Sequence, residues 1–112
     1  MALALNRFKT YTKALTTSPQ TIYTAPTGYT GIILYAHVTN YTGSAAATSL
    51  TMSHVRSSTT TEIIKGANVP IKDAYIPLDG KLVLETSDYI TATAGTNSIL
   101  KILVSVLETA NA

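Results

Sequence analysis

Cysteine and tryptophan are absent from the 112-residue chain, and charged residues make up only 12% of it, roughly half the usual share for soluble domains. Without cysteine the chain has no disulfide, no thiol nucleophile and no cysteine-ligated zinc or iron–sulfur site. No apolar run approaches the roughly 18–20 residues of a membrane-spanning helix. At the N-terminus the charges follow a short apolar stretch, whereas a secretory signal has them before a longer one. We therefore expect a soluble, unprocessed single domain.

The few charges are unevenly distributed along the chain. Residues 1–61 contain four basic residues and no acid, while residues 62–112 contain six acids and four lysines, so the halves sum to +4 and −2. Three of the basic residues, Arg7, Lys9 and Lys13, lie close together. They are interpreted either as protective charges on a solvated strand edge or as an arm that docks on an acidic surface of a neighbouring subunit, in a ring or trimer. Three cations and a pI of 8.9 give only a weak indication of phosphate binding, so no direct nucleic-acid binding is expected.

Apolar residues recur with period two in several segments, a pattern typical of strands that bury one face. Turn residues separate these segments, and Asp79-Gly80 is a hairpin-type signal. No convincing helical stretch of ten residues is present. The predicted strands are 7–15, 20–25, 31–40, 47–56, 60–66, 68–72, 80–85, 88–94 and 98–107.

Short strands at this spacing predict an all-β fold, an antiparallel β-sandwich of the jelly-roll or Ig-like type with about eight strands. We expect residues 1–15 to form an extended N-terminal arm and residues 16–112 a single β-sandwich domain. The residues predicted to form the core are Ile32, Leu34, Leu50, Leu82, Leu84, Ile90, Ile102, Val104 and Val106.

Residues for catalysis or metal binding are scarce. His37 and His54 lie in predicted strands and could face each other across a sheet, but two ligands are too few for a metal site without a suitably placed carboxylate. Neither a GxSxG nucleophile turn nor a phosphate-binding glycine loop occurs. The sequence therefore predicts no catalytic residues, no cofactor and no metal, and the protein is not expected to be an enzyme.

Tyrosine is the dominant aromatic residue, with seven copies against one phenylalanine. Its apolar ring and polar hydroxyl suit it to interfaces and to sugar-binding surfaces, although it is also an ordinary strand residue. A sugar platform is the weaker interpretation because tryptophan is missing. The candidate assembly residues are Arg7, Lys9, Tyr11, Lys13, Tyr41 and Tyr75.

Five stretches between residues 20 and 108 carry a recurrent combination of strand and turn residues. They are TIYTAPTGYTG at 21–31, VTN at 38–40, LDGKLVLE at 78–85, DYI at 88–90 and VSVLE at 104–108. Together they resemble small virion structural proteins of tailed bacteriophages. Where that pattern has a glycine directly before the aspartate of the DYI stretch, this chain has Ser87.

The resemblance implies a non-enzymatic β-sandwich that coats or joins parts of a particle. The function expected first is a capsid decoration (cement) subunit that stabilises the assembled shell. Its partners would be further copies of itself and other virion proteins, the major capsid protein above all, with no membrane. Its place would be the virion, assembled in the host cytoplasm. The alternatives are a neck, collar or tail accessory subunit, and a carbohydrate-binding β-sandwich on a virion or cell surface.

Overall fold

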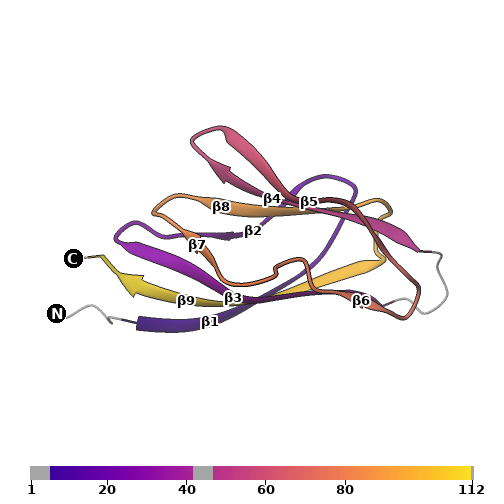
Figure 1. Ribbon diagram of the computed structural model, residues 1–112, viewed down its shortest axis with the longest axis horizontal. Coiled ribbons are helices and arrows are strands. Elements are labelled where there is room, and N and C mark those ends of the chain that lie inside the picture. Colours follow the sequence, from indigo (N-terminus) through magenta and orange to yellow (C-terminus); the bar gives the residue numbers. More distant parts are fainter. Residues whose placement is uncertain (1–5, 42–46, 112) are drawn as a thin grey trace.

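The chain folds into two antiparallel β-sheets that pack face to face, which confirms the predicted all-β sandwich (Figure 1). The structure, a computed structural model, describes residues 6–41 and 47–111. Sheet A has the strand order β1-β9-β3-β6, with β7 also paired to β3, and sheet B has the order β2-β8-β4-β5. The strands are β1 (Asn6–Ala14), β2 (Gln20–Thr24), β3 (Tyr29–Asn40), β4 (Thr48–Arg56), β5 (Thr59–Val69), β6 (Ala74–Tyr75), β7 (Leu82–Leu84), β8 (Tyr89–Ala94) and β9 (Leu100–Ala110).

The N-terminal segment is extended, as expected, but its described part belongs to the sandwich. Residues 6–14 pair with β9 over their whole length, from Asn6 opposite Thr109 to Ala14 opposite Lys101. This stretch is thus an edge strand of sheet A and not an arm that leaves the domain. The rest of the predicted arm before residue 6 lies outside the described residues.

Two predictions about strand boundaries were wrong. The predicted strands 60–66 and 68–72 are replaced by a single strand, β5, that runs through to Val69. Its pairing with β4 shifts register at Gly66, which has a φ of 69°, so this glycine marks a β-bulge and does not end the strand. Asp79-Gly80 does not close a hairpin, because β6 and β7 on either side of it both pair with β3.

The core lies between the two sheets and contains six of the nine predicted residues in fully buried positions: Leu50, Leu84, Ile90, Ile102, Val104 and Val106. Leu82 is only partly buried and packs against this core. The prediction that Ile32 and Leu34 lie in the core was wrong, because the register of β3 against β9 shifts between Ile33 and Tyr35. The shift reverses the alternation, so that Ile33 before it and Ala36 after it face the core.

The turn that joins β7 to β8 holds Ser87 in the left-handed region, with a φ of 75°, and the Asp88 N–H donates to the Glu85 carbonyl at 2.9 Å. Glycine adopts this conformation without the steric cost that a side chain brings. We therefore expect Ser87→Gly to raise the free energy of unfolding by about 0.5 kcal/mol, measured by urea denaturation. The control Ser105→Gly, on strand β9, should lower it. A destabilising Ser87→Gly would contradict the prediction.

Candidate functional site

The basic residues of β1 face a carboxylate of their own chain. Arg7 lies directly opposite Glu108 in the pairing of β1 with β9, and directly paired residues point to the same side of a sheet. Arg7 Nη2 lies 2.7 Å from Glu108 Oε1, and Lys9 Nζ lies 3.6 Å from the same oxygen. The Glu108 side chain is only 1% exposed. Neither Arg7 Nε nor Glu108 Oε1 makes an aligned hydrogen bond within the described residues, so charge attraction dominates this contact.

Tyrosine side chains enclose the same carboxylate. The Tyr23 hydroxyl donates to Glu108 Oε2 at 2.6 Å, the Tyr11 ring centroid lies 5.2 Å from that of Tyr23, and the Arg7 guanidinium lies 3.9 Å above the Tyr29 ring. Burial alone would raise the pKa of Glu108, but the hydrogen bond from Tyr23 and the nearby cations lower it below its ordinary value. Burial, together with the hydrogen bond to Glu108, raises the pKa of Tyr23. These contacts therefore favour the ionised form of Glu108, although its side chain is buried next to the edge strand β1.

A second buried carboxylate, Asp88, lies at the start of β8. Arg56 donates to it from Nε at 3.0 and 3.1 Å and from Nη2 at 2.7 Å. The Glu85 backbone N–H donates to Asp88 Oδ2 at 3.0 Å, and His54 Nε2 lies 3.2 Å from the same oxygen. The hydrogen bonds from Arg56 are the main cause that lowers the pKa of Asp88 to about 2. This network ties the β4–β5 hairpin to the turn before β8.

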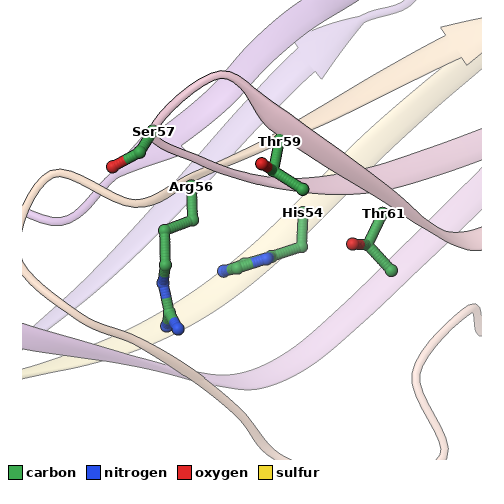
Figure 2. A pocket seen from close by; sticks show the side chains of 5 residues that line it. All are labelled: His54, Arg56, Ser57, Thr59 and Thr61. Carbon is green, nitrogen blue, oxygen red and sulfur yellow. The ribbon is translucent and has the colours of Figure 1, made fainter.

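The hollow beside this network has a volume of about 470 Å³ and is lined by His54, Arg56, Ser57, Thr59 and Thr61. Figure 2 shows the His54 and Arg56 side chains projecting to the same side of their strand. Arg56 is not available to an anion, because Asp88 and Glu85, whose Oε2 is 2.9 Å away, already balance its charge. Among the described residues no group of three His, Cys, Asp or Glu side chains could hold a metal ion.

Three of the four basic residues of the first half therefore find acidic partners within the chain. Arg7 and Lys9 pair with Glu108, and Arg56 pairs with Asp88 and Glu85. These contacts account for much of the uneven charge distribution without a neighbouring subunit.

The other candidate assembly residues lie apart from this cluster. Lys13 is exposed and makes no ion pair with any residue that the structure describes. Tyr41 is 40% exposed and lies under Lys101, whose Nζ is 4.4 Å from the ring centroid. Tyr75 is partly buried and packs against the core, and Tyr11 does the same beside Tyr23. The structure thus groups Arg7, Lys9 and Tyr11 but does not bring the remaining three to them.

Glu108 and Asp88 were not predicted as partners of these basic residues. A signal for Glu108 was present, because it continues the period-two series of core-facing residues in β9 that includes Val104 and Val106. A charged residue at a core-facing position needs a partner. Asp88 continues the core-facing series of Ile90, Ala92 and Ala94 in the same way, and its partner Arg56 is 32 residues away. The two histidines do not face each other, since His37 is paired with Leu103 on the outer face of sheet A and His54 lies in sheet B beside Asp88.

Comparisons with known proteins give little beyond the fold. No family model matches the chain, and no curated protein is similar to it in sequence. A solved structure that aligns with the chain is described as "Bacillus endospore appendages form a novel family of disulfide-linked pili", with a TM-score of 0.44 and 8% sequence identity over 100% of this chain and 97% of that one. The part of the chain that the structure describes contains no helix long and apolar enough to cross a membrane.

Proposed function

We propose that this chain is a non-enzymatic structural subunit of a bacteriophage virion and acts as a capsid decoration (cement) protein. The proposal starts from the resemblance in residues 21–31, 78–90 and 104–108. The observation that supports it is that these distant segments meet at one end of the sandwich. Ser87 N–H donates to the Ala25 carbonyl and Ala25 N–H to the Asp88 carbonyl, each at 2.9 Å. The resemblance therefore concerns one contiguous structural unit and not scattered turn residues.

The third segment joins the same unit through side chains. Glu108 of this segment accepts a hydrogen bond from the Tyr23 hydroxyl at 2.6 Å. Thr86 Oγ1, between the stretches 78–85 and 88–90, donates to the Tyr29 carbonyl at 2.9 Å. The motif residues thus support one another's positions.

Attachment to a particle would use the free edge of β1 in sheet A. β1 pairs with β9 on one side only, so the other edge of a nine-residue strand can receive a strand from a partner. Lys13 lies on this strand. A cement subunit makes many such weak contacts, which add up over a symmetric shell. Because it binds the assembled lattice better than the free coat protein, it stabilises the lattice by linkage.

The test is to add the purified protein to particles of the encoding phage that lack it, and to measure bound copies and particle melting temperature. Copies on the scale of the whole shell, with a higher melting temperature, are expected. Copies on the scale of one ring would favour the neck, collar or tail alternative. Absence of binding would overturn the proposal.

Lys13 offers a test of the attachment edge. We expect Lys13→Glu to lower particle affinity by about two- to fivefold at low salt and less at high salt, the size of an exposed ion pair. Lys65→Glu, an exposed charge reversal on β5, is the matched control and should bind normally. Lys9→Glu is unsuitable because it would place a second carboxylate beside Glu108. Equal affinity of both variants would contradict the involvement of this edge.

The carbohydrate-binding alternative is favoured by one observation. A hollow of about 320 Å³ on sheet A is lined by Tyr41, His37 and Lys101 among others, and the His37 ring stacks on Tyr35 with centroids 6.0 Å apart. Aromatic rings and polar groups of this kind suit a sugar. This alternative expects saturable glycan binding that is lost in Tyr41→Ala, whereas the cement function expects none.

A further inference from the structure

The outer face of sheet A carries an apolar row across four strands. Phe8 of β1 is paired with Leu107 of β9, Leu107 with Ile32 of β3, and Ile32 with Val83 of β7. Directly paired residues share a face, and in β9 the neighbours Val106 and Glu108 face inward. These four residues, the outer apolar row, therefore face away from the core. Phe8 is 75% exposed and Val83 is 53% exposed.

On β1, β9 and β3 the surroundings of the row are almost without charge. The next paired set on one side is Thr10, Ser105 and Tyr35, and on the other side Asn6, Thr109 and Thr30. Among the outward-facing positions of β1, β9 and β3 that the structure describes, Lys101 is the one formally charged residue. An apolar centre with a polar, uncharged surround is typical of an interface core and unusual for a sheet face left in water.

No described element covers this side of the molecule. In Figure 1 the strands β1, β9 and β3 form the lower layer, and sheet B lies on its other side. The face spans β1, β9 and β3 at ~4.8 Å each over about nine residues at ~3.4 Å each, with the three residues of β7 beside β3. Two such faces together would bury on the order of 1,000 Å², the lower limit for a specific interface.

We infer that the outer face of sheet A binds the same face of a second copy of this chain, forming a twofold dimer. On β1, β9 and β3 a charged partner would find only Lys101 to pair with, and no acid, while the exposed Lys81 and Glu85 flank Val83 at the margin of the face. An uncharged central face is complementary to itself. An isologous contact requires this self-complementarity. Two sheets in such a contact pack with their strands about 30° apart.

The position of Lys101 selects the symmetry axis. With the twofold axis along the outer apolar row, each row residue lies near its own counterpart. Six residues separate Leu107 from Lys101 along β9, or about 20 Å at ~3.4 Å per residue. The two lysines then lie at opposite ends, about 40 Å apart, which exceeds the ~8 Å Debye length at physiological salt. An axis parallel to the strands would instead bring the lysines together and is disfavoured.

This inference does not depend on the virion proposal. The dimer uses the outer face of sheet A, whereas particle attachment uses the free edge of β1, so either can fail alone.

The first test is the mass of the full chain by sedimentation over a wide concentration range. We expect a dimer of the 11.9 kDa chain that dissociates on dilution. Phe8→Glu and Val83→Glu change exposed side chains, so the fold should survive, as checked by circular dichroism. Each should weaken dimerisation by about 100-fold or more, the scale of an interface hot spot. The control Ile76→Glu changes a residue that is 57% exposed outside the strands and should dimerise normally.

Three outcomes would overturn the inference. These are a wild-type chain that stays monomeric at every concentration, a folded Phe8→Glu variant that dimerises as tightly as wild type, and a monomer that loses particle attachment when Phe8 is changed. The last outcome would assign the face to another virion protein.

The second test addresses the axis and exploits the absence of cysteine from the chain. Leu107→Cys places a thiol in the outer apolar row, and Lys101→Cys places one at the far end of β9. With a thiol-reactive cross-linker that spans about 10 Å, the distance between stacked sheets, we expect a linked dimer from Leu107→Cys and none from Lys101→Cys, whose thiols would lie about 40 Å apart. The reverse result would overturn the proposed axis.

Discussion

Replacement of Asp88 by alanine is expected to lower the free energy of unfolding by about 2–3 kcal/mol, the size of a lost set of hydrogen bonds to a buried charge. The Asp88 side chain is 4% exposed and accepts hydrogen bonds from Arg56 and from the Glu85 backbone N–H, with His54 also in contact. Without it, the Glu85 N–H and His54 lose their partner, and the β4–β5 hairpin loses its contact with the turn before β8. Urea denaturation measures the change.

The control is Asp79→Ala, which removes an exposed aspartate from a turn and should change stability by less than about 0.5 kcal/mol. Equal effects of the two substitutions would contradict the role of Asp88.

The stabilisation that the Asp88 carboxylate provides should disappear in acid. The folded-state pKa of Asp88, about 2, is below its ordinary value of 3.8, so the unfolded state binds the proton more readily. The stabilisation is therefore fully present above about pH 5 and is lost as the pH falls through 4 towards 2. The difference in stability between wild type and Asp88→Ala should shrink over this range. Glu108 is present in both proteins, so its titration cancels from the difference. A difference that stays constant from pH 6 to pH 2 would contradict the assignment.

Replacement of Glu108 by glutamine is expected to lower the free energy of unfolding by about 2 kcal/mol. The change removes the negative charge that Arg7 and Lys9 face and sets a neutral amide against the Tyr23 hydroxyl. The expected cost is below that of a fully buried pair because Arg7 is 34% exposed and can turn towards water. Relative to wild type, the variant should show a larger increase in amide hydrogen exchange in β1 than in β8, since this contact holds the edge strand to the sheet.

Two comparisons make this test specific. Glu62→Gln, at an exposed position of β5, is the matched control and should be nearly neutral. A double-mutant cycle of Arg7→Gln with Glu108→Gln should give a coupling of about 1 kcal/mol, because the two side chains are in contact. A coupling near zero would mean that Glu108 is stabilised by Tyr23 and Lys9 without Arg7.

Most of the strands could be predicted from local patterns. In β9, the alternation of Leu100, Ile102, Val104 and Val106 with less buried residues runs unbroken, and these four are buried as expected. Period-two alternation arises from the pleat of one strand, so it can be recognised without knowledge of the neighbouring strands. The turn at Ser87 was recognisable for a similar reason, since its conformation depends on a few adjacent residues.

The phase of β3 shows where local patterns fail. Ile32, Ile33 and Leu34 are consecutive apolar residues, so either phase agrees with the sequence. A bulge between Ile33 and Tyr35 decides it, and a one-residue shift moves every later side chain to the other face. The same bulge leaves Ile32 on the outer face, beside Leu107.

The amino-acid order alone was enough for the class of fold, the approximate strands and the presence of an unusual basic segment, because each of these depends on neighbours along the chain. The partner of that segment depends on which strands become neighbours in space. The pairing of β1 with β9 places Arg7 opposite Glu108, 101 positions later, and the four-strand register aligns Phe8, Leu107, Ile32 and Val83. Contacts of this kind come from sheet register, which is set by the packing of the whole core.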